Sequence, residues 1–382
     1  TLKPSTLFES RADMLVYGMG EKPITEICQM LQKGIPFQSL TNIPQTCVLR
    51  GKKEKYATNK KWQTITLASH EECLTDKKKY ATNFRYIEEE SNSIHAAKLI
   101  QPVADKLIIV NPPYAPMTTE EIDTVYDLPF TRLPHPKYKD KEIPAYNMIR
   151  HSITLHRGCF GGCAFCTISA HQGKFIASRS EQSIMREVEH VCEMPDFKGT
   201  ISDLGGPSAN MYSMRGKDSG ICEQCKRPSC LHPAVCKNLN TDHSRLLALY
   251  SKVRKVPAVK HCFVGSGIRY DLIMHRTGDR KIDTANREYL EAVIKHHVSG
   301  RFKVAPEHSS DNVLHLMRKP SFKLFRELTA RFNAINNKEH LKQQIIPYFI
   351  SSHPGCNLED MADLAINTKE LDFKLEQVQD FT

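Results

Sequence analysis

The sequence predicts an α/β protein in which a barrel or partial barrel of parallel strands follows a separate N-terminal α/β domain. From residue 146 onward, β-forming segments alternate with amphipathic helices about six times, which is typical of parallel strands joined by right-handed helical crossovers. Unusual residues, cysteines and paired glycines above all, stand directly after these strands. In parallel α/β folds that edge of the sheet holds the site, so this placement favours a barrel over a doubly wound sheet.

The composition is that of an ordinary soluble protein. The 382 residues allow two domains, and 40% of them are hydrophobic and 25% charged. No apolar run approaches the ~20 residues that a membrane span needs, and no secretory signal opens the sequence. We therefore expect a cytoplasmic protein with no membrane partner. The first residue is Thr1 rather than Met, so the sequence can be part of a longer chain.

The first 110 residues are interpreted as a partial α/β domain. Residues 12–34, ADMLVYGMGEKPITEICQMLQKG, predict a strand, a turn at Gly18 and Gly20, and a helix. Such a turn could hold a phosphate at the helix N-terminus, but the third glycine of a dinucleotide fingerprint is missing, which favours a plain strand–turn–helix unit. The proline-rich residues 111–145 predict an extended linker between this domain and the barrel.

The barrel, over residues 146–382, is predicted element by element. Runs of β-branched and aromatic residues mark its strands, and apolar residues at helical spacing mark the helices between them. Residues 216–240 interrupt the order as an insertion with four cysteines. The expected strands are 147–158, 199–206, 260–267, 301–306, 343–352 and 375–381, and the expected helices are 180–192, 241–255, 284–298, roughly 311–337 and 358–370.

The formal net charge of +10 includes two lysine-rich stretches, residues 51–62 and 76–84. Lysine clusters bind the phosphates of nucleic acids in many proteins. In a chain of this charge, however, a solvated lysine-rich face is the favoured interpretation. A nucleic-acid substrate is therefore permitted but not indicated.

The cysteines carry the clearest chemical signal. Of the 13 cysteines, Cys159, Cys163 and Cys166 stand close together in HRGCFGGCAFC, residues 156–166. Clustered thiols in a chain without a secretory signal indicate metal binding. A structural zinc site closes with four protein ligands, whereas three cysteines on a cubane 4Fe-4S cluster leave one iron open for an outside ligand. The glycines between the cysteines give the loop the backbone freedom to surround a bulky cluster.

A second group of cysteines lies in the insertion, and its four thiols suit a closed site. Zinc and a second iron–sulfur cluster both fit this group, and the sequence does not choose between them. A cysteine-rich loop without metal is the competing interpretation. Because the insertion follows the glycines of the second strand, we expect the site at the same strand edge as the first cysteine group. Its members are Cys222, Cys225, Cys230 and Cys236.

Taken together, the motifs resemble one known family. CFGGCAFC has the C-x3-C-x2-C spacing of the radical S-adenosylmethionine (SAM) superfamily. The whole of 147–382 resembles the YgiQ family of radical SAM proteins, relatives of the methylthiotransferases. This resemblance implies a partial (β/α)6 radical SAM barrel, preceded by part of a Rossmann-like domain. The other motifs that carry it are SDLGGPSANMY (202–212), NLNTDHSRLLALY (238–250), GSGIRYD (265–271), VAPEHSSDNVLHLMRKP (304–320) and YFISSHPGCNLEDM (348–361).

The resemblance also implies cofactors and their contacts. Cys159, Cys163 and Cys166 would ligate a 4Fe-4S cluster, and SAM would bind its free iron. One electron would cleave SAM to a 5′-deoxyadenosyl radical, which abstracts hydrogen from a substrate. No catalytic side chain is assigned. For Glu307 and His308, capping of the next helix is an equally favoured interpretation. The implied SAM contacts are Phe165, Gly205, Gly206, Ser266, Arg269 and Glu307.

Three functions stay open at this point. The first is a radical SAM enzyme of unknown substrate, served by an external electron donor such as flavodoxin or ferredoxin. The second is a non-catalytic, metal-stabilised nucleic-acid-binding protein, which would have no use for an open three-thiolate site. The third is a tRNA methylthiotransferase-like enzyme. It is disfavoured because Cys28, Cys47 and Cys73 are scattered instead of forming the further cluster group of such enzymes.

Overall fold

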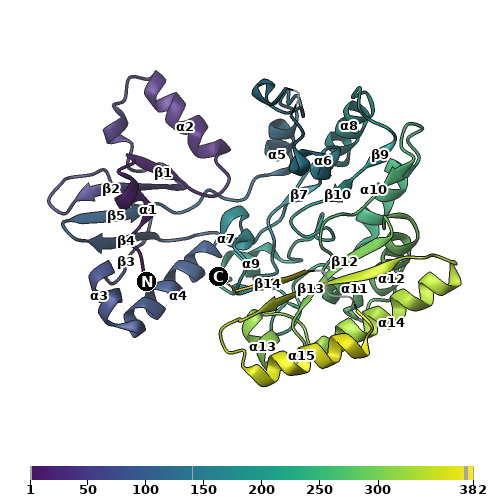
Figure 1. The fold of residues 1–382 in the computed structure, drawn as a ribbon. Coiled ribbons are helices and arrows are strands. Elements are labelled where there is room, and N and C mark those ends of the chain that lie inside the picture. Colours follow the sequence, from purple (N-terminus) through teal and green to yellow (C-terminus); the bar gives the residue numbers. More distant parts are fainter. Residues whose placement is uncertain (1, 140, 374–376, 382) are drawn as a thin grey trace. The chain divides into compact units, whose positions relative to one another are not determined.

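The computed structural model describes residues 2–139, 141–373 and 377–381 (Figure 1). The chain divides into two compact units. Both contain helices and strands, so the prediction of a mixed α/β protein is confirmed at that level. The first unit comprises residues 1–116, 167–174 and 218–228, and the second comprises residues 117–166, 175–217 and 229–382.

The first unit contains a five-stranded sheet in the order β1-β2-β5-β4-β3. β3 and β4 pair in parallel, whereas β1–β2, β2–β5 and β4–β5 pair antiparallel. The buried side chains of Leu7, Cys47, Val103 and Ile108 form an apolar cluster against the sheet. The strands are β1 Met14–Val16, β2 Thr46–Gly51, β3 Thr64–Thr66, β4 Lys98–Val103 and β5 Lys106–Val110, and the helices are α1 Thr6–Ser10, α2 Glu21–Gln32, α3 His70–Thr75, α4 Lys77–Ser91, α7 Ile168–Gln172 and α9 Ser219–Glu223.

This sheet differs from the Rossmann-like domain that the resemblance implied, because a Rossmann-like sheet is mostly parallel. Only Ala104 and Asp105 separate β4 from β5, and a connection that short joins antiparallel neighbours. The strand, turn and helix predicted for residues 12–34 are present as β1 and α2. Gly18 in the turn adopts φ 67°, a conformation that residues with a Cβ rarely adopt.

Most strands of the second unit pair in parallel and alternate with helices, as the sequence predicts. β10 (Asp203–Gly205) pairs with β6 (Ser152–Thr154), β11 (His261–Cys262) with β9 (Thr200–Ile201), and β13 (Gln344–Ser351) with both β12 (Arg301–Glu307) and β14 (Gln377–Asp380), each in parallel. β7 (His156–Arg157) and β8 (Ala177–Ser178) pair antiparallel. Ser202 alone separates β9 from β10, and both lie within the predicted strand 199–206. This segment pairs through β10 with β6, which precedes it, and through β9 with β11, which follows it. Closure into a partial barrel stays a prediction. Of the sixth predicted strand, residues 375 and 376 lie outside the described residues.

The elements of the second unit place its site residues at the carboxyl ends of strands. The strands are β6 Ser152–Thr154, β7 His156–Arg157, β8 Ala177–Ser178, β9 Thr200–Ile201, β10 Asp203–Gly205, β11 His261–Cys262, β12 Arg301–Glu307, β13 Gln344–Ser351 and β14 Gln377–Asp380. The helices are α5 Thr119–Tyr126, α6 Pro144–Ile149, α8 Glu181–Cys192, α10 Ser244–Arg254, α11 Tyr270–Met274, α12 Arg280–His296, α13 Asp311–Met317, α14 Phe322–Lys338 and α15 Leu358–Glu370.

One continuous apolar core holds the strands and helices of the second unit together. On α8, for example, the buried residues Ile184, Val188 and Val191 recur at helical spacing and pack against this core. Burial of such a face contributes most of the stability of a surface helix. Among the described residues, no helix is both long and apolar enough to cross a bilayer.

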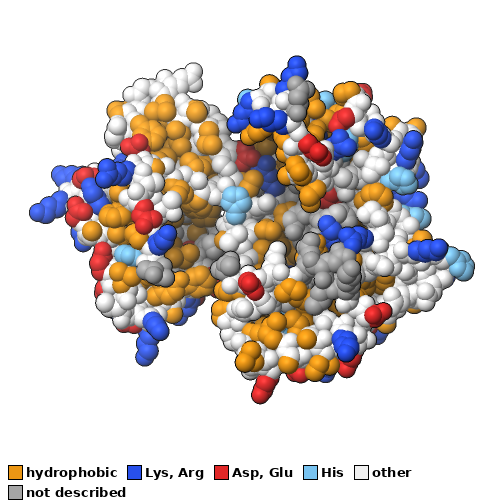
Figure 2. Space-filling view, in the orientation of Figure 1, with side chains coloured by type: hydrophobic (Ala, Val, Ile, Leu, Met, Phe, Trp, Pro, Cys, Tyr) orange, Lys and Arg blue, Asp and Glu red, His pale blue; other side chains and the backbone are white. Residues whose placement is uncertain are grey.

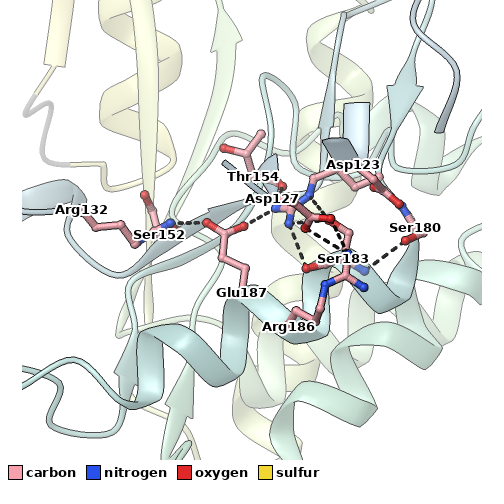
Figure 3. A network of polar contacts seen from close by, with 10 residues as sticks. Asp123, Asp127, Arg132, Ser152, Thr154, Ser180, Ser183, Arg186 and Glu187 are labelled. Atoms are coloured by element: carbon pink, nitrogen blue, oxygen red, sulfur yellow. Dashed lines mark hydrogen bonds and ion pairs between the residues drawn. The ribbon is translucent and has the colours of Figure 1, made fainter. Parts of the chain in front are cut away.

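Residues 117–145 are not the extended linker that their prolines predict. They include α5, and their side chains bind the start of α8 (Figure 3). Asp123 accepts a hydrogen bond from the backbone N–H of Ser180 at 2.9 Å. The fully buried Arg179 pairs with Glu187 of α8, and Arg132 pairs with the same carboxylate. The described residues of this segment, 117–139 and 141–145, therefore belong to the second unit.

The lysine-rich stretches belong to the first unit. On the face shown in Figure 2, basic side chains of this unit are interspersed with acidic ones. Lys79, for example, lies 2.5 Å from a carboxylate oxygen of Glu72 on the surface. Alternating charge of this kind is typical of a solvated face rather than of a phosphate-binding patch.

Candidate functional site

The three cysteines of the predicted cluster lie on one loop of the second unit, directly after β7, and each is partly buried. The loop is tightly curled. The N–H of Cys166 donates to the carbonyl of Cys163 at 3.1 Å, and Gly162 between the cysteines adopts φ 57°. The N–H of Ala164 donates to the carbonyl of Met317 at 3.1 Å, which ties the loop to the end of α13.

A buried guanidinium faces this loop. Arg269 is 8% exposed, and its Nη1 donates to Sγ of Cys163 at 3.4 Å. Its Nε and Nη2 donate to the two carboxylate oxygens of Asp271, at 3.0 and 2.5 Å. Gly161 allows this approach, because a Cβ at that position would lie 2.5 Å from Nη1 of Arg269. A fixed positive charge therefore stands beside the thiols.

Charge and burial act together on these side chains. Burial alone would raise the pKa of Asp271, but the Arg269 guanidinium holds it below its ordinary value. Burial raises the pKa of Cys159 to about 11; Arg269 opposes that shift, and Cys163 and Cys166 add to it. Since iron binds thiolates, the nearby cation favours the form of the loop that can hold metal.

The loop offers three partly buried thiols as its donor set. A structural zinc ion closes with four protein ligands, whereas three cysteines on a cubane 4Fe-4S cluster leave one iron open. Within residues 2–139, 141–373 and 377–381, no group of three His, Cys, Asp or Glu side chains is arranged to hold a single metal ion. Ligation of a cluster by the three cysteines stays a prediction.

The paired glycines of the predicted SAM motif end β10. A Cβ on Gly205 would lie 2.8 Å from the hydroxyl of Ser266, and a Cβ on Gly206 would lie 2.6 Å from the ring of His156. Ser266 donates both its hydroxyl and its backbone N–H to the carboxylate of Asp203. The start of β10 is thus tied to the loop after β11, and a side chain at Gly205 or Gly206 would collide with Ser266 or with the His156 ring.

His156 is a member of the site that the sequence did not single out. Its side chain is fully buried, and neither ring nitrogen has a hydrogen-bond partner among the described residues. Burial lowers its pKa to about 3, so the ring is neutral. A buried polar group without a partner costs about 1–3 kcal/mol. The ring lies next to Gly206, and its nitrogens are suited to hydrogen bonds with a polar ligand.

Glu307 and His308, at the end of β12, take different roles. Glu307 adopts φ 71°, and Nζ of Lys319 lies 3.5 Å from its carboxylate, with both side chains buried. His308 accepts the backbone N–H of Ser310 at 3.0 Å, just before α13 begins. His308 thus bonds the N-cap residue Ser310 and no N–H inside α13, which has no side-chain cap, so the helix-capping interpretation is wrong for both residues. Glu307 forms an ion pair instead.

All six implied SAM contacts lie in the second unit, beside the cysteine loop or after β10, β11 and β12. Phe165 packs edge-on against His353, with ring centroids 6.5 Å apart. Sequence reasoning missed the partners Asp203, Asp271 and Lys319. Both aspartates stand two residues from a predicted contact, and all three partners lie inside the motifs quoted above. A search for charged residues within the motifs would therefore have found them.

The second cysteine group is divided between the units. Cys222 and Cys225 belong to the first unit, where the N–H of Cys225 donates to the carbonyl of Cys222 at 3.1 Å. There the ammonium of Lys174, 2% exposed, lies 3.6 Å from Sγ of Cys225. Cys230 and Cys236 belong to the second unit, where the N–H of Cys236 donates to the carbonyl of Cys230 at 2.7 Å. A metal site formed by all four stays a prediction.

The sequence of the chain is similar to a family model and to several known proteins. Residues 1–152 match the family model described as Radical SAM N-terminal. The whole chain aligns with proteins named UPF0313: it is 58% identical to one from Bacteroides thetaiotaomicron and covers 63% of it. It is 59% identical to one from Porphyromonas gingivalis, covering 60%, and 44% identical to one from Methanocella arvoryzae, covering 61%. The chain thus spans about three fifths of the length of these curated relatives.

A solved structure is also similar. It is the radical SAM methyltransferase TsrM from Kitasatospora setae, with tryptophan and a SAM analogue bound. The sequence identity is 11% and the TM-score 0.46, over 98% of this chain and 52% of that one.

Proposed function

Because the chain belongs to the UPF0313 (YgiQ-like) family of radical SAM proteins, we propose that it is the core of a radical SAM enzyme of unknown substrate. The observation that carries the proposal is the loop with Cys159, Cys163 and Cys166, curled beside the buried Arg269. When bound, a 4Fe-4S cluster supplies the electron that cleaves SAM to methionine and a 5′-deoxyadenosyl radical, which then abstracts hydrogen from the substrate.

The side chains of the second unit have distinct parts in this proposal. Cys159, Cys163 and Cys166 hold the cluster, and the guanidinium of Arg269 offsets part of its negative charge. The apolar core against which Phe165 packs excludes water from one side of the loop. Gly205, Gly206, Ser266 and Glu307 receive the polar arm of SAM at the strand ends, which we take to be arranged as a partial (β/α)6 barrel.

The proposal also includes an external electron donor and a second metal site. An external one-electron donor of the flavodoxin or ferredoxin class reduces the cluster, since no other electron source is implied. The four cysteines of residues 222–236 bind a second metal, zinc or a second iron–sulfur cluster. The interspersed surface charges of the first unit give a nucleic-acid-binding function no support of its own.

The decisive test is reductive cleavage of SAM by anaerobically reconstituted protein. We expect the wild-type chain to form 5′-deoxyadenosine with dithionite. Replacing any one of Cys159, Cys163 and Cys166 with Ala should abolish this product and the cluster absorption. Cys192→Ala, which removes a partly buried thiol on α8, is the matched control and should change neither. A loop variant that still cleaves SAM would contradict the proposal.

The SAM site is tested by binding rather than by turnover. Gly206→Ala should weaken SAM binding in calorimetry by tenfold or more, an effect of about 1.4 kcal/mol, because the added Cβ would lie 2.6 Å from the His156 ring. Gly267→Ala, where a Cβ would have no neighbour within 4 Å, is the control. Equal affinities in the two variants would remove the paired glycines from the site.

A further inference from the structure

A second thiol stands at the same strand edge as the cysteine loop. Cys356 follows β13 in the motif HPGC, and its side chain is partly buried. Two contacts join it to the candidate site. His353, three residues earlier, packs against Phe165. His308, whose ring faces Cys356, directly follows Glu307 in the chain.

Hydrogen bonds around His308 define what its ring offers to the sulfur. The side chain is fully buried, and Nδ1 accepts the backbone N–H of Ser310 at 3.0 Å. In the neutral imidazole the proton must then sit on Nε2, which lies 3.5 Å from Sγ of Cys356. Burial lowers the pKa of His308 and so favours this neutral form. His308 therefore donates to the sulfur and does not remove its proton.

Cys356 itself is a thiol rather than a thiolate. Burial, followed by the negative charge of Asp360, raises its pKa above the ordinary value. Its S–H donates weakly to the carbonyl of Asn357 at 3.6 Å. The loop cysteines must lose their protons to bind iron, so Cys356 is suited to a different task, one that uses the S–H bond.

We propose that Cys356 is a catalytic residue that gives a hydrogen atom to the substrate radical, and that His308 is a positioning residue that orients its sulfur. The inference rests on the proposed function. An S–H bond is weaker than most C–H bonds, so a carbon radical can take its hydrogen atom. The S–H bond breaks homolytically, a C–H bond forms on the substrate, and a thiyl radical remains on Cys356.

The thiol is then restored by one electron and one proton. The electron comes from the same flavodoxin- or ferredoxin-type donor that reduces the cluster, and it converts the thiyl radical to a thiolate. The Nε2–H of His308 stabilises this thiolate by a charge-assisted hydrogen bond. A proton from solvent then reforms the S–H group, and the partial exposure of Cys356 gives solvent access to it.

The test does not require the substrate to be known. When SAM is cleaved without substrate, the 5′-deoxyadenosyl radical takes hydrogen from another donor, and in D2O a nearby thiol carries deuterium. The reconstituted chain is incubated with SAM and titanium(III) citrate in thiol-free D2O, and the deuterium in 5′-deoxyadenosine is measured by mass spectrometry. We expect several-fold less deuterium with Cys356→Ala and Cys356→Ser than with wild type or the control Cys192→Ala.

The positioning role is tested with two substitutions of the histidine. His308→Gln keeps an N–H donor near the sulfur and should retain most of the deuterium transfer, whereas His308→Ala should lose it. Deuterium transfer that is unchanged in Cys356→Ala would overturn the assignment. If wild type forms no 5′-deoxyadenosine at all, the proposed function fails and this inference fails with it, so the two failures are distinguishable.

Chemical labelling provides a readout that does not depend on turnover. SAM bound to the reconstituted wild-type chain should slow the alkylation of Cys356 by iodoacetamide several-fold, measured by peptide mass spectrometry. Cys28, an exposed cysteine of the first unit, should be labelled at the same rate with and without SAM. Labelling of Cys356 that SAM does not slow would overturn the proposal even if the Cys356 variants fail to bind a cluster.

Discussion

Each unit of the chain buries a cation beside a cysteine sulfur, but the two cations are held differently. In the second unit, Arg269 lies 3.4 Å from Cys163, and a bidentate ion pair with Asp271 fixes its guanidinium. In the first unit, Lys174 lies 3.6 Å from Cys225 and donates at 2.8 Å to the carbonyl of Arg227, a neutral acceptor.

The two cations therefore differ in how rigidly they are held beside the sulfur. A guanidinium is a planar fork, so Arg269 can bind a carboxylate and a sulfur at the same time with little loss of freedom. A lysine ammonium is a point charge on a flexible stem, and its direction depends on the groups around it. The charge beside the cysteine loop is therefore preorganised before any cluster binds. Buried charge should therefore contribute more to the stability of the second unit than to that of the first.

Lowering the pH should give the largest difference in stability between the two units. It should destabilise the second unit more, because the buried histidines of the described residues all lie there. Burial lowers the pKa of His156 to about 3 and, against opposing hydrogen bonds, those of His243 and His297 to about 4. Between these folded-state pKa values and the ordinary histidine pKa of 6.5, the unfolded chain binds more protons than the folded chain. Stability is therefore full above pH 6.5 and falls with acid, by about 1.4 kcal/mol per pH unit for each histidine.

The first unit offers an internal reference for this experiment, since Trp62, the only tryptophan of the chain, belongs to it. We expect hydrogen exchange of β9–β11 amides to accelerate at a higher pH than the one at which Trp62 fluorescence changes. A Trp62 transition that comes first would reverse the comparison.

Arg269→Met should have the next largest effect, because it leaves the carboxylate of Asp271 buried without its partner. Removing one member of a buried ion pair costs about 3–5 kcal/mol, to be measured by urea unfolding of cluster-free protein. The double variant Arg269→Met/Asp271→Leu removes both charges and should recover much of that stability. A loss below about 1 kcal/mol for the single variant would show that the pair does not constrain the site.

Lys174→Met should cost less than Arg269→Met. The substitution removes one charge-assisted hydrogen bond to a carbonyl, worth about 1.5–3 kcal/mol, but it also relieves the burial of an ammonium group. Urea unfolding followed by Trp62 fluorescence reports directly on this unit. If Lys174→Met destabilises its unit more than Arg269→Met destabilises the other, the flexible lysine is the more important cation.

Asp127→Asn should have the smallest effect. Its ion pair with Arg186 is about half exposed on both sides, and exposed pairs contribute about 0.2–1 kcal/mol (Figure 3). Glu187→Gln removes a buried carboxylate from the same segment and serves as the contrast. Equal unfolding free energies for the two variants would mean that residues 117–145 are anchored by something other than the buried network.

Local patterns in the sequence predicted most of the elements. Helical spacing predicted α8, α10 and α12, and β-forming runs predicted the strands of the second unit other than β8. The predicted strand 147–158 is wrong at its start, because residues 147–149 belong to α6. The extended linker predicted from the prolines of residues 111–145 is wrong, because α5 starts at a capping box formed by Thr118 and Glu121 and ends before the next proline, Pro129. The mixed, largely antiparallel sheet of the first unit could not be predicted from one strand–turn–helix unit, since pairing direction depends on strands far apart in the chain.

By itself, the sequence determined the cysteine loop, because three thiols within one short stretch stay close together however the rest of the chain folds. The paired glycines and their place after a strand were likewise local features. Only the tertiary structure decided that Arg269 faces Cys163 and that His308 faces Cys356. Those pairs lie 106 and 48 residues apart in the chain, so burial and packing of the whole second unit, not local preference, bring them together.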